Sequence, residues 1–315
     1  MSLDAKLAAG HICLGALYNV TGECQQAAPE LRRGAEREPT SDDAYTGLAW
    51  AYEHSGQLQA AEQTYQKAIE LRPSYWRTYN SLGVFYFSRG NYEKAVPMFQ
   101  PVTELTPDNC YGYSNLGLAH YRLGQLDEAA TMFRRSLEIH PNAPAYSNLG
   151  VIAFFTGHYA ESVRRFEKAT ELEPQSYRCW GNLADAYRWT PGDRDRAKAT
   201  YARAIRLAER ALEVNRRDTD ALGYLALYEP KSGELERARQ LIGQALATAP
   251  RDVDVLSKAV EVYTLAGDEQ KALDYQKGAV RGSYSRFELQ ANPELAGSRS
   301  DPTYREIMAE APTPR

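Results

Sequence analysis

The sequence of 315 residues is poor in cysteine and contains no long apolar run. Its four cysteines lack the paired spacing of a zinc site or a disulfide framework, so we expect a reducing, cytoplasmic environment and no bound metal. No apolar stretch approaches the ~18 residues that a membrane span needs. The first eighteen residues contain one basic side chain, Lys6, and no small-residue cleavage site follows them. These features argue against a secretory signal and against membrane insertion.

Recognisable catalytic motifs are lacking as well. The sequence contains no Walker loop, zinc-protease helix motif, Gly-x-Ser-x-Gly elbow or dinucleotide fingerprint, and its five histidines are scattered. The net charge of −4 and the isoelectric point near 5.9 provide no basic excess with which to neutralise phosphates. We therefore expect neither an enzyme nor a nucleic-acid-binding protein, and no cofactor.

What the sequence does contain is a repeat. Five prolines mark a period of 34, 34, 34 and 33 residues, namely Pro39, Pro73, Pro107, Pro141 and Pro174. The next proline in phase, Pro250, follows after two periods and eight further residues. One extra residue fits the turn at 189–196, and seven fit an unbroken helix at 205–214. Seven residues make nearly two helical turns, so this insertion predicts a longer helix in an unchanged register.

Each period predicts two helices joined by a turn. In one unit the apolar face of the first helix carries Tyr79, Leu82, Gly83 and Tyr86, and that of the second carries Ala95, Phe99 and Val102. These spacings place each set on one helical face. Gly90 predicts the end of the first helix, and Pro107 that of the second. Pro29 and Pro97 lie inside second helices, where we expect a bend or a break.

A 34-residue helix–turn–helix with this pattern of aromatic, Leu-Gly, Tyr, Ala, aromatic, Ala and Pro resembles the tetratricopeptide repeat (TPR) family. The resemblance implies an all-α, right-handed superhelical solenoid whose first helices line a concave groove for protein partners. We expect a repeat array over residues 1–286 and capping helices and a tail over 287–315. The expected units span about 8–41, 42–75, 76–109, 110–142, 143–176, 177–218, 219–252 and 253–286.

The segment from Ser285 has a different pattern. Ser285, Asn292 and Asp301 each stand where a helix N-cap is expected, the last two directly before a proline. We expect two or three short helices that close the stack. This tail also resembles the ends of repeat arrays in bacterial signalling proteins such as Ser/Thr kinases. Because the first repeat starts almost at the N-terminus, we consider that the chain was cut from a longer one.

The family resemblance implies that a second stripe on the first helices faces the groove. The candidate binding residues on and beside it are Trp50, Arg77, Asn80, Tyr111, Asn115, Tyr121, Arg122, Asn148, Phe154, Arg178, Asn182, Arg188 and Trp189. Asn115, Asn148 and Asn182 recur at one repeat position, and their amides can pair with the backbone of an extended peptide. Arginines can fork onto carboxylates, and aromatic rings can anchor a partner. The alternatives are amides that satisfy a neighbouring helix, intramolecular arginine pairs and rings that pack between repeats.

The charge is distributed unevenly. Residues 177–218 contain ten basic and six acidic side chains, which gives +4 and leaves −8 for the rest of the chain. Two interpretations stay open, a solvated outer helix face and a docking surface for an acidic segment of a partner.

These features favour a non-catalytic scaffold that binds a protein or peptide in its groove, as a monomer or with weak self-association. One alternative is the regulatory repeat region of a bacterial signalling enzyme of the kinase type whose catalytic domain lies elsewhere. Another is a structural array that assembles with itself through its first unit.

Overall fold

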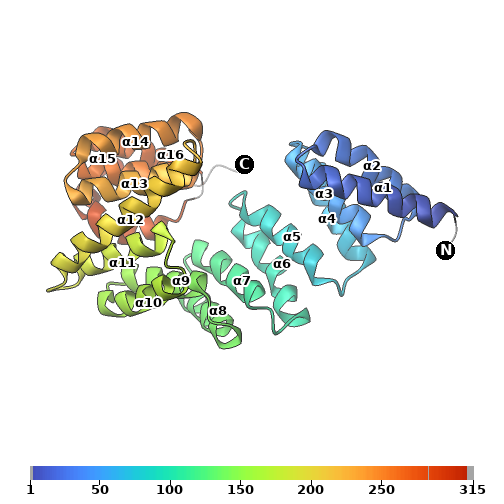
Figure 1. The fold of residues 1–315 in the computed structure, drawn as a ribbon, viewed down its shortest axis with the longest axis horizontal. Coiled ribbons are helices and arrows are strands. Elements are labelled where there is room, and N and C mark those ends of the chain that lie inside the picture. Colours follow the sequence, from blue (N-terminus) through green and yellow to red (C-terminus); the bar gives the residue numbers. More distant parts are fainter. Residues whose placement is uncertain (1–2, 283, 311–315) are drawn as a thin grey trace. The chain divides into compact units, whose positions relative to one another are not determined.

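The computed structural model describes residues 3–282 and 284–310, and over these residues the chain is helical without strands (Figure 1). Sixteen helices follow one another as eight helix–turn–helix units. In seven units the two helices pack as an antiparallel pair, namely α1 (Leu3–Val20) with α2 (Cys24–Arg37), α3 (Asp42–His54) with α4 (Leu58–Leu71), α5 (Trp76–Phe87) with α6 (Tyr92–Leu105), α9 (Ala143–Phe155) with α10 (Tyr159–Leu172), α11 (Tyr177–Trp189) with α12 (Arg194–Val214), α13 (Thr219–Ser232) with α14 (Leu235–Thr248), and α15 (Val253–Leu265) with α16 (Glu269–Arg281). The remaining unit consists of α7 (Cys110–Arg122) and α8 (Leu126–Ile139). The expected all-α repeat architecture is confirmed.

The turn inside each pair contains a glycine with a positive φ, between 72° and 101°. A side chain with a Cβ is disfavoured in this left-handed region, which is why glycine stands there. A second glycine role concerns packing. A Cβ on Gly83 would lie 2.5 Å from the Phe99 ring, and one on Gly150 would lie 2.7 Å from the Phe166 ring. The small residue after leucine therefore makes room for the aromatic side chain of the second helix.

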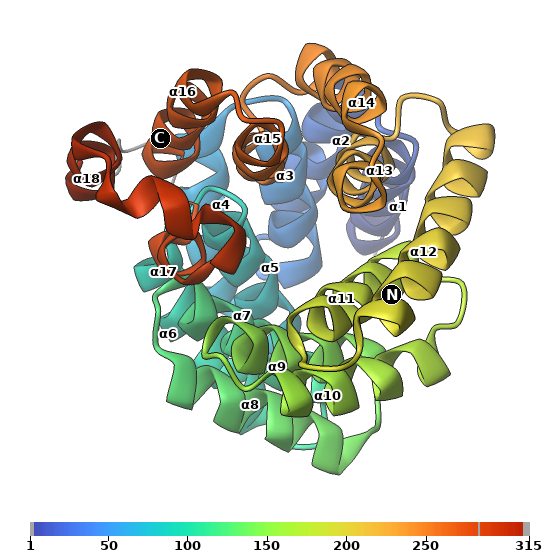
Figure 2. The same ribbon diagram turned by 90° about the vertical axis from the view of Figure 1, so that its left-hand side faces the viewer.

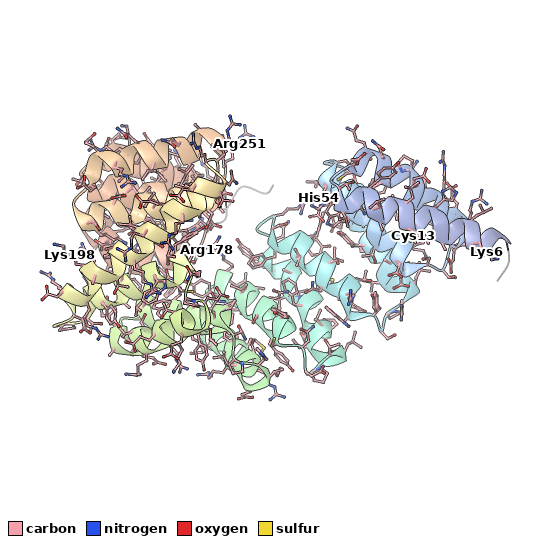
Figure 3. All side chains as sticks on the ribbon, viewed as in Figure 1. Lys6, Cys13, His54, Arg178, Lys198 and Arg251 are labelled. Carbon is pink, nitrogen blue, oxygen red and sulfur yellow. The ribbon has the colours of Figure 1, made fainter. Side chains whose placement is uncertain are left out.

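The core follows the repeat. The aromatic residues of the second helices are almost fully buried, each with at most 2% of its surface exposed, namely Tyr65, Phe99, Phe133, Phe166 and Tyr201. Side chains lie between the paired helices (Figure 3). Each helical pair thus depends on its neighbours to cover its apolar face.

Three helices test the finer expectations. α12 has 21 residues, against 14 in α10 and α14, so the insertion does lengthen a helix by two turns. Of the bend or break expected at the internal prolines, the break is wrong, because α2 and α6 run without interruption through Pro29, Pro97 and Pro101. The bend stays a prediction. A proline removes one hydrogen-bond donor, but the packed neighbours hold the helical backbone on both sides of it.

The chain divides into two compact units, Met1–Ala119 (unit 1) and His120–Arg315 (unit 2). The boundary falls near the end of α7, inside the array expected to span residues 1–286. No feature of the sequence indicates this division. Each unit is described by itself below.

Unit 2 ends in a tail of three short helices, α17 (Arg286–Ala291), the 3₁₀ helix η1 (Pro293–Ser300) and α18 (Pro302–Ala309). Ser285, Asn292 and Asp301 cap them by accepting hydrogen bonds from backbone N–H groups, as expected. Four tail side chains are buried together with apolar residues of α15 and α16, namely Leu289, Leu295, Tyr304 and Ile307. Figure 2 shows this tail beside α15 and α16. The tail covers the apolar face of the last helical pair.

Candidate functional site

In unit 1 the candidate residues lie on three first helices, α3, α5 and α7. We call the part formed by Arg77, Asn80 and Val84 of α5 and by Tyr111 and Asn115 of α7 the α5–α7 face. Tyr111 is 73% exposed and Val84 is 45% exposed. The Arg77 guanidinium lies 5.4 Å from the Trp76 ring centroid and is exposed to solvent. This face combines apolar, amide and cationic groups.

Two asparagines of this face are joined. The Nδ2 group of Asn115 donates a hydrogen bond of 2.9 Å to Oδ1 of Asn80 on the preceding first helix. An amide side chain has two N–H donors and an oxygen with two lone pairs. The pair therefore keeps the Nδ2 group of Asn80 as a donor and Oδ1 of Asn115 as an acceptor. These are the two groups that a peptide backbone requires.

Trp50 on α3 packs against His54 of the same helix. Its ring stacks on the imidazole of His54 with 3.6 Å between the centroids. The His54 Nδ1 group donates a hydrogen bond of 2.9 Å to the Trp50 carbonyl, which fixes the imidazole against the indole. Trp50 is half-buried by this contact.

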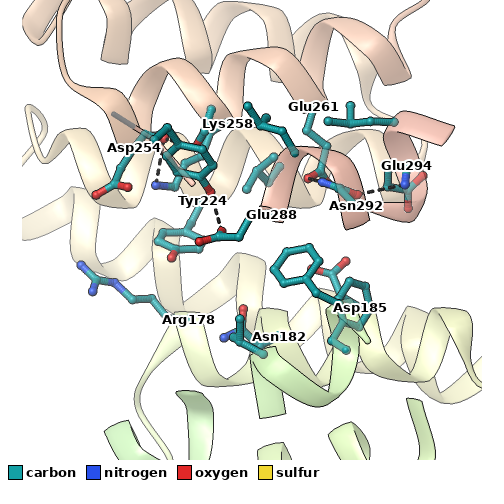
Figure 4. Close-up of a pocket in the computed structure, with 18 of the residues that line it drawn as sticks. Arg178, Asn182, Asp185, Tyr224, Asp254, Lys258, Glu261, Glu288, Asn292 and Glu294 are labelled. Atoms are coloured by element: carbon teal, nitrogen blue, oxygen red, sulfur yellow. Dashed lines mark hydrogen bonds between the residues drawn. The ribbon is translucent and has the colours of Figure 1, made fainter. Parts of the chain in front are cut away.

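In unit 2 the candidate residues surround a cavity of about 440 Å³. First helices supply Asn148, Phe154, Arg178, Asn182 and Trp189, and the tail supplies Glu288, Asn292 and Glu294. Figure 4 shows Asn182 facing Glu288 of the tail across this cavity. The tail thus forms one wall of the site. The repeating asparagines are divided, with Asn115 in unit 1 and Asn148 and Asn182 in unit 2.

The arginines of this cavity are paired within the chain. Arg122 lies 3.4 Å from Glu288 and 3.5 Å from Asp254. Arg188 lies 3.0 Å from Glu294. The expectation that these two side chains point at carboxylates of a partner needs correction, because carboxylates of the tail and of α15 occupy that place.

Arg178 is paired as well, with Asp220 at 2.6 Å. Its side chain nevertheless keeps 56% of its surface exposed. It is therefore the most accessible of the three candidate arginines in unit 2, since Arg188 is 36% and Arg122 is 20% exposed. Of the candidate arginines, only Arg77 has no ion-pair partner among the residues that the structure describes.

The aromatic candidates of unit 2 differ in exposure. Tyr121 is only 7% exposed, which corrects its assignment as a surface anchor. Burial and the nearby Glu288 carboxylate raise the pKa of its phenol well above the ordinary value. Phe154 and Trp189 both contact the Tyr159 ring, at 5.5 and 6.1 Å between centroids, and both line the cavity. They remain candidates for contact with a ligand.

Sequence reasoning missed a buried charge network in the lining of this cavity. The Lys231 ammonium, whose side chain is 2% exposed, lies 2.6 Å from Asp185 and 2.7 Å from Glu261. The Nδ2 group of Asn292 donates to the other Glu261 oxygen at 2.9 Å, and the Tyr201 hydroxyl donates to Asp185. The network joins α11, α13 and α15 to the tail. The signal for it was Glu261, an acidic residue inside the apolar run 259–263.

The network shifts the pKa values of Lys231 and Glu261. Burial alone lowers the pKa of Lys231, but the carboxylates of Asp185 and Glu261 raise it above the ordinary value. Burial alone raises the pKa of Glu261, but the charge of Lys231 and the hydrogen bonds from Lys231 and Asn292 lower it. Lys231 and Glu261 are therefore both charged at neutral pH.

Over residues 3–282 and 284–310, no cluster of three His, Cys, Asp or Glu side chains is arranged to hold a metal ion. Within the same residues, no helix has the length and apolar character needed to cross a bilayer.

The consecutive helical pairs define a helical repeat protein. Models described as tetratricopeptide repeat match residues 42–75, 77–142, 110–175 and 177–210. The chain belongs to the tetratricopeptide repeat family. Members of this family are typically non-catalytic modules for protein interaction, and that general role follows from membership.

Solved structures share the fold. The chain is similar to a chain in the APC/C hetero-tetramer Cut9–Hcn1, with a TM-score of 0.57 and 18% identity. That match covers 82% of this chain and 48% of the other, so this chain spans about half the length of that relative. It is also similar to MamA from residue 41 onward from Desulfovibrio magneticus RS-1, with a TM-score of 0.50, 22% identity and coverage of 55% and 97%. No curated protein matches the chain.

Proposed function

We propose that the chain is a non-catalytic scaffold that binds a segment of a partner protein on the α5–α7 face of unit 1. The observation that carries this proposal is the hydrogen-bonded pair Asn80–Asn115 beside the exposed Tyr111 ring. The amide pair offers one donor and one acceptor to an extended backbone, whatever its side chains are. Tyr111 supplies a rigid aromatic contact, and Arg77 supplies a cation. Such a preformed surface binds with a low ordering cost.

The cavity of unit 2 supports a different kind of ligand. Its volume of about 440 Å³ is that of a small-molecule pocket, and the tail walls it on one side. The tail is held by four buried large side chains, each contributing about 1.5–3 kcal/mol. An extended segment would have to displace this packing to run along the first helices of unit 2. We therefore assign the extended partner segment to unit 1, and to Asn148 and Asn182 we assign contacts with a short ligand or chain end.

The proposal is tested by peptide selection on the intact chain. A random peptide library displayed on phage is selected against the wild type, and the recovered peptides are measured by fluorescence anisotropy. We expect Tyr111→Ala/Asn115→Ala to weaken them at least tenfold. The matched control is Asn148→Ala/Phe154→Ala in unit 2, which should leave their affinity within twofold. Recovered peptides that bind the unit 1 variant as tightly as the wild type would contradict the proposal.

The two alternatives from the sequence remain predictions. A regulatory region of a signalling enzyme requires a catalytic domain in the same reading frame, which the surrounding coding sequence decides. Self-assembly through the first unit draws support from α1, where Leu14 is 39% and Leu17 is 57% exposed. Light scattering over a concentration series decides this point, because a constant monomer mass excludes self-assembly.

A further inference from the structure

The lengthened helix α12 carries basic side chains that no acid neutralises. Of its six cations, Arg196 pairs with Glu167 and Asp193, and Arg203 stacks on the Trp180 ring at 3.8 Å. The other four are Arg194, Lys198, Arg206 and Arg210, and all four are exposed. None of them has an ion-pair partner within the part of the chain that the structure describes. We call these four residues the α12 ridge.

The ridge has a regular geometry. Its members follow one i, i+4 row, with Ala202 at the middle position. Such a row runs along one inclined ridge of a helix, and sixteen residues span about 24 Å. Arg206 and Arg210 lie in the part of α12 that the insertion adds. The additional turns therefore extend the charged row as well as the core, in which Ala208 is fully buried with Ile205 and Leu212 packed beside it.

The nearby acids do not cancel this charge. Glu209, which precedes Arg210, is paired with Arg237 at 2.6 Å. Asp195 lines a neighbouring recess together with Trp189. By contrast, Arg178 and Arg188 of the preceding helix are each paired with a carboxylate. The ridge thus forms the part of the available positive charge in the segment 177–218 that lies on α12, and the exposed Arg216 and Arg217 follow the helix.

A hollow of about 460 Å³ opens at the N-terminal end of the ridge. Arg188, Arg194, Lys198 and Lys231 line it together with Trp189 and Tyr201, and no carboxylate does. The charge of Lys231 is neutralised by Asp185 and Glu261, and that of Arg188 by Glu294. Arg194 and Lys198 supply the uncompensated charge at this hollow. Lys198 lies at the surface of unit 2 (Figure 3).

We infer that the α12 ridge and this hollow bind an acidic segment of a partner protein. Carboxylates spaced along the segment pair with the four cations, and an apolar or aromatic residue of the segment contacts Trp189 in the hollow. A protein segment fits better than a nucleic acid, because the whole chain carries −4 and four cations are few for phosphate binding. This surface is separate from the α5–α7 face, so either can fail without the other.

The probe is a fluorescein-labelled 16-residue peptide with glutamate at every fourth position and one phenylalanine. Its partner probe has glutamine in place of glutamate. We expect the intact chain to bind the glutamate peptide and the affinity to fall as salt rises. Carbodiimide cross-linking should join a glutamate of the peptide to Lys198, as identified by mass spectrometry.

Two variants with equal loss of charge are compared, and circular dichroism checks that both are folded. The ridge variant is Arg194→Gln/Lys198→Gln/Arg206→Gln/Arg210→Gln, and the control is Lys67→Gln/Arg134→Gln/Arg164→Gln/Lys168→Gln. We expect a loss of at least tenfold in the ridge variant and less than twofold in the control.

Several results would overturn the inference. These are no binding of the glutamate peptide to the wild type, equal binding to the ridge variant, or a cross-link away from α12. Tighter binding of a 16-nucleotide single-stranded DNA or of phosphatidylserine vesicles would assign the ridge to another class of ligand.

Discussion

Arg188 on α11 and Glu294 in the tail are 106 residues apart in sequence, and their side chains lie 3.0 Å apart. The contact places the tail against the first helices of unit 2. Arg122 and Glu288 repeat the arrangement, with an arginine at the end of α7 and a carboxylate of α17. The tail therefore forms a wall of the groove that the sequence predicts to be open.

Lys231→Met should strongly destabilise unit 2. It leaves the carboxylates of Asp185 and Glu261 facing each other without their shared cation, which costs about 3–5 kcal/mol. Urea unfolding followed by circular dichroism measures this loss. Lys67→Met on the surface is the control and should change the stability by less than about 0.5 kcal/mol. The triple variant Lys231→Met/Asp185→Asn/Glu261→Gln should recover most of the loss, and no recovery would argue against the network.

The stability should depend on Glu261 in acid. Because the pKa of Glu261 is lower in the folded state than its ordinary value of 4.5, its stabilisation is present above about pH 4.5. It is lost as the pH falls through the lower folded-state pKa. Lys231 has a raised pKa, so its contribution is full below pH 10.5 and is lost only at higher pH. We expect the stability difference between wild type and Glu261→Gln/Lys231→Met to be constant from pH 5.5 to 9 and to shrink below 4.5. A difference that persists unchanged at pH 3 would contradict this.

Gly83→Ala should destabilise unit 1. The added Cβ would lie 2.5 Å from the Phe99 ring, and overpacking of this kind costs about 1–3 kcal/mol. Gly243→Ala is the matched control, since no heavy atom lies within 4 Å of its Cβ position. It should stabilise the chain by about 0.5–1 kcal/mol, because alanine has the higher helix propensity. Thermal unfolding distinguishes the lower melting temperature expected of Gly83→Ala from the higher one expected of Gly243→Ala. Adding Phe99→Leu to Gly83→Ala should relieve the overpacking.

Leu295→Ala should loosen the tail. Leu295 is 1% exposed, and truncation of a buried leucine costs about 2–5 kcal/mol. We expect faster amide hydrogen exchange in α17, η1 and α18 and in the facing helices α15 and α16. Leu105→Ala, at a position 40% exposed, should cost less than about 1 kcal/mol and leave that exchange unchanged. Unchanged exchange in both variants would mean that the tail is not held by this side chain.

The fold was predictable because its information is local and repeated. The positions of Tyr65, Phe99 and Phe133 follow from one 34-residue period, and the length of α12 follows from the register of Pro174 and Pro250. The caps at Asn292 and Asp301 depend only on the residues next to them. The continuous helices at Pro29 and Pro97 could not be foreseen from propensity, because the surrounding repeats hold the backbone.

The site was predictable only in part. The periodic pattern identified Tyr111 and Asn115 as surface residues of a first helix. It could not reveal that Arg122 and Arg188 meet tail carboxylates, because those contacts join segments far apart in sequence. The pairing of Lys231 with Glu261 could not be predicted either, because neither residue belongs to the repeat pattern.

The covered face of the last helical pair also limits how such a chain can lengthen. A ninth hairpin joined directly after α16 would have to dislodge Leu289, Leu295, Tyr304 and Ile307 before it could dock. Between two existing hairpins, the apolar seams on both sides already match those of an inserted copy. Duplication within the array therefore costs less than extension beyond α16, so growth by whole hairpins is favoured at internal positions.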